Sequence, residues 1–510
     1  MTIARQRTAR ALEKTATLIP MNRDLSLTSQ RILFASSEAQ SLKGFGDLAD
    51  FTTTLTTSLG SLDHDVRLVL PAYPALLSHR DRFTEASRIR LPGNGQGARL
   101  LQGRLGRNVT LYLVDIPGQF DQPDHADPQN TVRFGLFSRI IALLAVNQAG
   151  IHWQPDLLHC NGWKTALAIS LLAEAWSRPA LVYSMHEAHH QICSGEQVSA
   201  LSIPVELLKA GTLEIQGRLS FEKGAVLLAD KLVLPSAGFR DELLQDPAAH
   251  PLAALLKKRT DQLMAIPPGI DYQRWSPTTD PHLEQHYDSS SFALKRLNRQ
   301  RLQTELALPL NAHDLLIGCL VTAHQNTEFQ QIGALLESVA PDIPVHLLIA
   351  AADNSRALQS LLDSVRQFPQ RISVQRDADE SRWHRILASS DCLLLPAQSY
   401  PSAHQAQCAL SYGTVPIAHA TKSIQGTVTD ATPANLLHGT ASGFLYRQAT
   451  EKQLADALIR VKAFHAKPAI WWQKLALQGM AQSFHALDTA KKYLQCYQSA
   501  IDHPAASPLA

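Results

Sequence analysis

The sequence has few cysteines, and none of them form a paired motif. Six cysteines stand singly along 510 residues, so neither a CxxC zinc-binding pair nor a dense disulfide framework fits. Long apolar runs are also missing, since a run such as residues 140–146 is far shorter than the ~20 residues that cross a bilayer. These absences exclude a small disulfide scaffold and a helical membrane protein, and a reducing cytoplasm is the expected location.

An excess of charge of either sign is missing as well. The chain has 47 Lys and Arg against 45 Asp and Glu, and residues 1–28 hold five of the former and two of the latter, which leaves 42 against 43. A balanced body lacks the attraction that nucleic acids or anionic membranes exert on basic proteins, so neither partner is expected. Residues 1–28 are predicted to be a basic, disordered tail, with an Arg-rich transit peptide as the alternative.

What the sequence does contain is a regular alternation of short apolar runs and longer stretches of helical period. This alternation begins at Arg31 and is typical of βα units that build parallel sheets, so the predicted fold class is α/β. A chain of 510 residues exceeds one hydrophobic core. The rhythm breaks at a polar segment around 276–291 and then resumes. We therefore expect two Rossmann-like domains, at 29–275 and 276–485, followed by a final helix and tail at 486–510.

The strand and helix predictions follow from the same patterns. Strands are predicted at 32–35, 66–70, 109–114, 157–160, 180–185 and 231–234, and in the second half at 315–320, 345–350, 372–375, 392–395 and 415–418. Helices are predicted at 451–465, around Trp471 and Trp472, and at 489–501. In open α/β sheets ligands lie beyond the carboxyl ends of the strands, so the segments after each strand are the candidate site.

Those segments carry a series of motifs in a fixed order. They are Leu48-Ala49-Asp50, His64-Asp65-Val66-Arg67, Phe120-Asp121, Arg133-Phe134, His159 with Trp163 and Thr165, Gly269-Ile270-Asp271 with Trp275, and Tyr412-Gly413-Thr414-Val415-Pro416. Together they resemble the bacterial glycogen synthases and plant starch synthases of glycosyltransferase family 5, over roughly residues 30–500. The resemblance implies the GT-B fold, in which two facing Rossmann-like domains are joined by a C-terminal helix that crosses back.

The resemblance also implies a reaction, the retaining transfer of glucose from ADP-glucose without a bound metal. Cations must meet the charge of the leaving diphosphate, and the family places an Arg and a Lys after the first strand of the second domain. Here Thr322 and Thr327 take those positions, and no Lys or Arg occurs between Arg301 and Arg356. Tyr400 stands where the family has the Glu of its "EPCGL" motif. The groups that the chemistry needs are therefore replaced.

Further departures fall on the neighbouring loops. Asn161 replaces the second His of the family's "HxHDWH", and an amide cannot exchange a proton. Asp47 enters the first glycine loop, where Lys43 stands one residue early, and Lys422-Ser423 replaces the glycine pair of "TGGLxDTV". By motif position, the nucleotide-sugar or glucan cleft is assigned to Gly44, Gly46, His186, Ser402, Ala403, His404, Tyr412, Gly413 and Thr414.

Two functional hypotheses follow from these departures. Loss of one transition-state donor costs ~10²- to 10³-fold in rate, so the loss of several predicts a catalytically impaired homologue. Such a protein acts by binding an α-glucan or maltooligosaccharide, or by associating with a competent synthase. The alternative is an active α-1,4-glucosyltransferase that uses ADP-glucose or another nucleotide sugar. No catalytic residue is assigned, because Asn161, Thr322, Thr327 and Tyr400 are degenerate, and neither a cofactor nor a metal is expected.

Some signals point elsewhere. Residues 186–190 satisfy HExxH, a zinc-protease signature, but they follow a predicted strand, so we interpret them as cleft lining or a solvated loop. The glycine-rich stretch 93–97 follows no convincing strand and is interpreted as a flexible loop. Trp163 is either the start of a helix or a glucan contact. Trp471 and Trp472 are expected to pack a helix between the domains, with a sugar-stacking platform as the alternative. Residues 412–416 are expected to end a helix and start the next strand.

Overall fold

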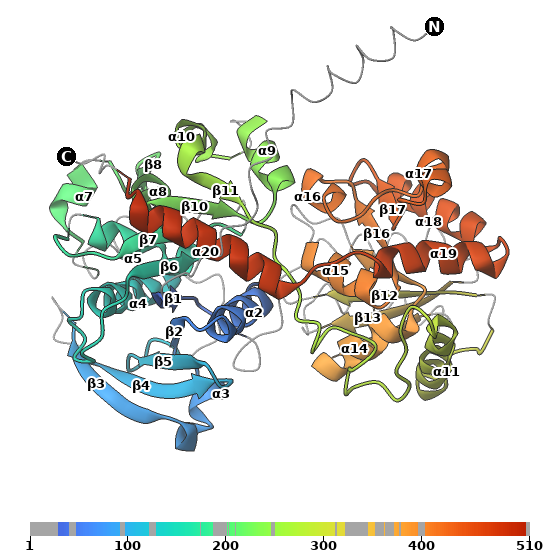
Figure 1. Ribbon diagram of the computed structural model, residues 1–510, viewed down its shortest axis with the longest axis horizontal. Helices are drawn as coiled ribbons and strands as arrows, with labels where there is room; N and C mark the ends of the chain where they lie inside the picture. Colours follow the sequence, from blue (N-terminus) through green and yellow to red (C-terminus); the bar gives the residue numbers. More distant parts are fainter. Residues whose placement is uncertain are drawn as a thin grey trace, which may run out of the picture.

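The computed structural model describes most of the chain from residue 29 onward. The described residues are 29–39, 47–91, 97–121, 129–173, 175–186, 201, 203–209, 211–245, 250–311, 314–321, 345–351, 362, 372–376, 379–395 and 403–505. They form two α/β lobes that lie side by side (Figure 1). The predicted basic tail at 1–28 lies outside the described residues. No helix within the described ranges combines the length and the apolar content that a membrane span needs.

The N-terminal lobe is built around a sheet with nine strands among the described residues. Its order is β11-β10-β7-β6-β1-β2-β5-β4-β3, parallel throughout except that β4 runs antiparallel to β3 and β5. The strands are β1 (Arg31–Ala35), β2 (Asp65–Pro71), β3 (Thr84–Arg90), β4 (Gly97–Leu105), β5 (Val109–Asp115), β6 (Leu157–Asn161), β7 (Ala180–Ser184), β10 (Lys231–Leu234) and β11 (Leu263–Ala265). The inner strands are buried on both faces, which explains their continuous apolar runs.

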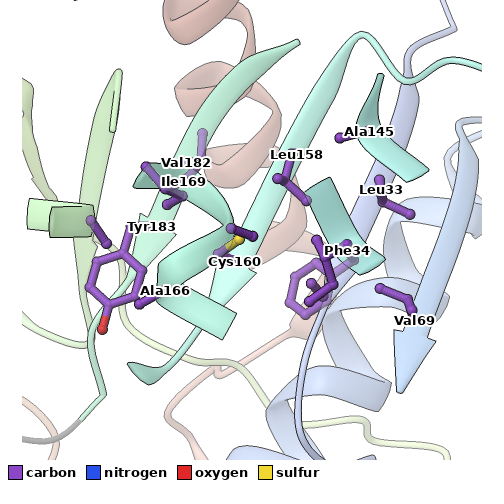
Figure 2. Close-up of a cluster of buried hydrophobic side chains, with 14 of the residues drawn as sticks. Leu33, Phe34, Val69, Ala145, Leu158, Cys160, Ala166, Ile169, Val182 and Tyr183 are labelled. Atoms are coloured by element: carbon purple, nitrogen blue, oxygen red, sulfur yellow. The ribbon is translucent and has the colours of Figure 1, made fainter. Parts of the chain in front are cut away.

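Helices cover both faces of this sheet and bury its core. They are α2 (Asp47–Ser61), α3 (Pro74–Leu77), α4 (Gln129–Ala145), α5 (Trp163–Leu172), α7 (Val205–Lys209), α8 (Phe221–Leu228), α9 (Ala237–Gln245) and α10 (Ala253–Lys258), with a small hairpin of β8 (Glu214–Ile215) and β9 (Arg218–Leu219). Side chains such as Leu33 and Leu158 from the strands and Ile169 from α5 are buried in this core (Figure 2). The core fixes the strand ends on which the site is built.

The C-terminal lobe contains a second, parallel sheet. Its described strands run in the order β14-β13-β12-β15-β16-β17, and they are β12 (Leu315–Val321), β13 (Val345–Ala351), β14 (Ile372–Arg376), β15 (Cys392–Leu395), β16 (Val415–His419) and β17 (Phe444–Tyr446). Its described helices are α11 (Lys295–Glu305), α14 (Glu380–Ser389), α15 (Ala403–Ser411), α16 (Lys422–Gln425), α17 (Pro433–His438), α18 (Glu451–His465) and α19 (Ala469–Met480). Several helices begin at a polar cap, as α14 does at Asp379, whose carboxylate accepts the amide of Arg382.

The last helix, α20 (Ala486–Asp502), leaves the C-terminal lobe and lies across the N-terminal one (Figure 1). Tyr497 Oη lies 2.7 Å from Nδ1 of His159 in the middle of β6, and the ring of Tyr493 stacks on the same histidine. Residues 266–291, which follow β11, form the connecting segment between the lobes. Next to the crossing of α20, Ile270 of this segment forms a β-bridge with His485. The chain therefore passes between the lobes twice at one place, and the predicted crossing helix is confirmed.

The predicted strands agree closely with described ones, but several strands were missed and two further statements were wrong. The antiparallel strands β3 and β4 were missed because both have an exposed, polar face, and the strands β8, β9, β11 and β17, of two or three residues each, were missed as well. The statement that the glycine-rich stretch follows no strand was wrong, since β3 ends at Arg90 and Gly97 opens β4, but residues 92–96 lie outside the described ones and the flexible loop stays a prediction. Trp472 does not pack between the domains; it packs against Phe444 and Phe464 inside the C-terminal lobe. Nothing in an isolated helix pattern says which lobe receives its apolar side.

Candidate functional site

The junction between the lobes is organised around one buried carboxylate, Asp50 of α2. It accepts hydrogen bonds from Arg274 Nη1 (2.6 Å) and Trp275 Nε1 (3.3 Å) in the connecting segment, and it forms an ion pair with His404 of α15. Burial by itself would raise the pKa of Asp50, but the neighbouring His404 and Arg274 lower it. Asp50 is therefore held ionised, and it joins the N-terminal lobe, the connection and the C-terminal lobe.

Ala403 and His404, two of the predicted cleft residues, begin helix α15 at this junction. The imidazole of His404 lies between Asp50 and Cys408, whose Sγ is 3.8 Å from Nε2. The sequence motif indicated the position of His404, where the family's "EPCGL" has a leucine, but not its partner. Asp50 belongs to the Leu48-Ala49-Asp50 motif and could have been recognised there as a candidate.

Arg274 extends the same set of contacts into the C-terminal lobe. Besides Asp50, its guanidinium forms an ion pair with Glu380 at the start of α14. The pKa of Glu380 is lowered, because the nearby His384 and Arg274 outweigh the effect of its burial. Neither Arg274 nor Glu380 was singled out in the sequence, since no local pattern connects two residues 106 positions apart.

The predicted residues Asn161 and His186 meet at the carboxyl ends of two neighbouring strands. Asn161 ends β6, and Gly162, with φ of +79°, turns the chain into α5. The Asn161 amide nitrogen donates to Thr52 Oγ1 (3.2 Å), and its oxygen lies 2.5 Å from His186 Nε2. Because the amide oxygen only accepts, His186 Nε2 is the donor in this contact.

That contact bears on the HExxH interpretation. The imidazole of His186 has Nε2 engaged by Asn161, and its ring lies 4.8 Å from the ring of Phe51. Residues 187–190 lie outside the described ones, so the second histidine of the motif is not placed. Asn161 and His186 form a small polar patch on the N-terminal lobe in which Asn161 is fully buried, so of the two only the half-buried His186 is open to a ligand, and Asn161 cannot relay a proton.

Lys422 and Ser423, at the position of the family's glycine pair, connect the lobes a second time. The backbone amide of Lys422 donates to Glu242 Oε1 of α9 (2.6 Å), and Ser236 Oγ donates to Ser423 Oγ (3.1 Å). Gly238 at the start of α9 touches this loop so closely that a Cβ there would overlap the carbonyl of Lys422. The loop is therefore occupied by contacts to the facing lobe.

Tyr412, Gly413 and Thr414 lie where α15 ends and β16 begins, as expected from the sequence. The buried Lys295 donates to Thr414 Oγ1 (2.8 Å) and to the carbonyl of Tyr412 (3.1 Å), and burial lowers its pKa to about 7. Tyr412 Oη donates to Asp280 (2.5 Å). In the described structure these residues hold the connecting segment against α14, and their place in the cleft stays a prediction.

Six further predicted site residues lie outside the described residues. They are Gly44, Gly46, Thr322, Thr327, Tyr400 and Ser402. The remaining predicted cleft residues are described and belong to two places, the Asn161–His186 patch on the N-terminal lobe and the segment 403–414 of the C-terminal lobe.

The two α/β lobes, the double crossing and α20 define the GT-B class of glycosyltransferases. A solved structure with this fold is the catalytic domain of starch synthase IV from Arabidopsis thaliana, bound to ADP and acarbose, with a TM-score of 0.84 at 19% identity over 93% of this chain and 100% of that one. The starch synthase catalytic domain family matches residues 31–258.

Sequence relatives narrow the class further. Glycogen synthase 2 of Nitrosococcus oceani is 35% identical over 484 residues, which cover 92% of this chain and 97% of that protein. Glycogen synthase of Thioalkalivibrio sulfidiphilus is 34% identical over 487 residues, covering 92% and 100%. The chain belongs to the glycogen synthase family.

Proposed function

We propose that this protein acts in α-glucan metabolism by binding a glucan chain, and that it transfers glucose from ADP-glucose poorly or not at all. The observation that carries the proposal is the replacement of the donor-side groups by Thr322, Thr327 and Tyr400. Fixed cations stabilise a departing diphosphate, and each such donor is worth ~10²- to 10³-fold in rate. A threonine hydroxyl carries no charge with which to replace them.

The contacts of the described basic groups support the same view. Arg274 lies between two carboxylates, and His404 faces Asp50. At the second contact between the lobes, the amide of Lys422 already has the Glu242 carboxylate as its acceptor. A nucleoside diphosphate would have to displace these carboxylates and would meet their charge, so its binding at the junction is disfavoured.

The acceptor side favours carbohydrate. The half-buried imidazole of His186 lies at the strand ends of the N-terminal lobe, held there by the fully buried Asn161, whose amide also contacts Thr52. Neutral donors and acceptors of this kind bind sugar hydroxyls without requiring charge. The starch synthase IV structure with the same fold was solved with acarbose bound, which supports a glucan as the ligand here.

The second candidate is an active α-1,4-glucosyltransferase that uses ADP-glucose or another nucleotide sugar. It is favoured by the match of about a third of all residues to proteins named glycogen synthase, over nearly their whole length. A further form of the first proposal is association with a competent synthase, for which the intact lobes would provide the surface.

Calorimetry distinguishes these functions. The full chain is titrated separately with ADP-glucose and with a maltooligosaccharide, and ADP release is followed with glycogen as acceptor. The proposal expects glucan binding that weakens in His186→Ala, without ADP-glucose binding or ADP release. Glucan-dependent ADP release would establish the transferase instead, and the absence of glucan binding would leave the synthase-associated form.

A gain-of-charge variant tests the donor side directly. The triple change Thr322→Arg, Thr327→Lys and Tyr400→Glu restores the family's residue types, and we expect it to introduce measurable ADP-glucose affinity. The matched control carries Thr322→Gln and Thr327→Gln, which add length but no charge. Equal affinities in both variants would refute the assignment of these positions.

A further inference from the structure

A cluster of metal-binding side chains lies beside the lobe junction, next to Tyr412 of the predicted cleft. It consists of His282 in the connecting segment and Glu380 and His384 on α14, and we call it the hinge cluster. One ligand atom from each residue lies within 4.8 Å of the others, and it is the one such group found among the described residues. Glu380 and His384 are four positions apart on one helix and so share a face.

The spacing within the cluster fits a tetrahedral ion. His384 Nε2 and Glu380 Oε1 are 3.5 Å apart. Metal–ligand bonds of about 2.0–2.2 Å at tetrahedral angles place neighbouring ligand atoms roughly 3.3–3.5 Å apart. The half-buried His282 ring, whose centroid is 4.9 Å from that of His384, closes the third side with a small rotation.

One buried carboxylate positions both histidines. Asp280 Oδ2 lies 2.8 Å from His384 Nδ1, and its Oδ1 accepts the backbone amide of His282 (2.9 Å). Without an ion, burial is outweighed by the carboxylates of Asp280 and Glu380, which raise the pKa of His384, so an ion would have to displace the Nε2 proton. With its proton on Nδ1, neutral His384 turns the Nε2 lone pair toward Glu380. This carboxylate–histidine pairing is the arrangement that orients metal-bound histidines in proteins. Trp275 fixes the ring further, stacking on it at 4.1 Å with a 4° interplanar angle.

His384 Nε2 itself is buried and unsatisfied. The side chain is 0% exposed, and Nε2 completes no hydrogen bond in the described part of the chain, although Glu380 Oε1 lies 3.5 Å from it. An orphaned buried polar atom costs about 1–3 kcal/mol, so its presence calls for an explanation. A metal ion bound to the lone pair would supply the missing partner.

The charge around the cluster allows a dication. Asp280 and Glu380 contribute two negative charges, and Arg274 is the cation that faces Glu380. Arg274 also pairs with Asp50, so it keeps a carboxylate if Glu380 turns toward an ion. Two imidazoles with one carboxylate favour Zn²⁺ over Mg²⁺ or Ca²⁺, which prefer all-oxygen sites.

We propose that His282, Glu380 and His384 form a Zn²⁺ site that ties the connecting segment to α14, with water as the fourth ligand. The site departs from the metal-free expectation of the sequence. It goes beyond the proposed function, because its proposed role is to tie the connecting segment to α14 and not to bind a glucan or a nucleotide sugar. It therefore stands or falls independently of any activity toward ADP-glucose.

The test uses the untagged full chain, stripped with a chelator and titrated with Zn²⁺ by calorimetry at neutral pH. We expect one ion per chain. His282→Ala and Glu380→Gln are each expected to weaken binding by at least the ~10- to 100-fold that the loss of an outer-sphere partner costs. His438→Ala, which removes an exposed histidine of the same lobe, is the matched control and is expected to leave the affinity unchanged.

A second readout reports the geometry. Co²⁺ in place of Zn²⁺ is expected to give the intense visible absorption of a four-coordinate ion, and Glu380→Gln is expected to abolish it. Thermal unfolding with and without Zn²⁺ shows that each variant is folded. The proposal is overturned by the absence of stoichiometric binding, by unchanged affinity in both cluster variants, or by the weak spectrum of six-coordinate Co²⁺.

Discussion

Asp50, the buried carboxylate at the junction, provides the sharpest test of how the two lobes are held together. Asp50→Asn keeps the size of the side chain and removes its charge, leaving Arg274 with Glu380 alone and taking the anion away from His404. Breaking a buried ion pair by removing one partner costs about 3–5 kcal/mol. Because Arg274 keeps one carboxylate, we expect the lower end, about 3 kcal/mol.

Thermal unfolding measures this cost. For a domain of 150–250 residues, 3 kcal/mol corresponds to a lowering of Tm by roughly 6–12 °C. Asp456→Asn, which changes an exposed carboxylate of α18, is the matched control and is expected to stay within about 0.5 kcal/mol. Adding His404→Leu to Asp50→Asn is expected to recover part of the loss, since removing both partners leaves fewer uncompensated groups.

The pH dependence of the same variant has a definite sign. The pKa of Asp50 is lower in the folded protein than in the unfolded chain, so its contribution is fully present above the unfolded value, near pH 4, and is lost as the pH falls toward the folded value. Wild type and Asp50→Asn should therefore converge in stability as the solution is acidified. If the Tm of Asp50→Asn equals that of the Asp456→Asn control at neutral pH, the ion-pair reasoning is refuted.

Three further predictions concern the contacts that fix the two lobes. Gly238→Ala introduces a Cβ that overlaps the carbonyl of Lys422, so we expect α9 and α16 to separate, with a loss of about 1–3 kcal/mol of stability. X-ray scattering should show a larger radius of gyration. An unchanged radius would contradict the close approach of the two helices. Tyr497→Phe removes the hydrogen-bond partner of His159 Nδ1 and should lower the free energy of unfolding in urea by about 1–3 kcal/mol. Tyr446→Phe is the control and should lower it little, because the Tyr446 hydroxyl has no hydrogen-bond partner among the described residues. Similar losses in the two variants would count against the role of the Tyr497–His159 bond. Burial lowers the pKa of His159 well below its usual value, so the unfolded chain takes up the proton first, and the free energy of unfolding should fall as the pH drops through about 6.5. In His159→Gln the plot of stability against pH should be flatter over this range. A plot identical to that of the wild type would contradict the prediction.

The strand ends were predictable because the sequence signals there are local. The apolar runs of β6 and β7 place Asn161 and His186 at the carboxyl edge of the sheet from periodicity alone. The motif order then indicated the GT-B fold, and the family comparisons and the crossing of α20 agree with it. What those signals left open was the set of partners, since a motif names a position and not what faces it.

The sequence by itself determined the α/β rhythm and predicted the two lobes and the replacement of the donor residues, because each of these is a local pattern of residue types. Only the tertiary structure decided that Asp50 meets His404 across the lobes, although hundreds of residues separate them in the chain. It also decided that His282 lies beside His384, about one hundred residues further along. Chain folding, rather than any period in the sequence, brings such residues together. Burial then determines their chemistry, since the pKa of Asp50 and the unsatisfied nitrogen of His384 depend on which charges and hydrogen-bond partners lie within a few ångströms.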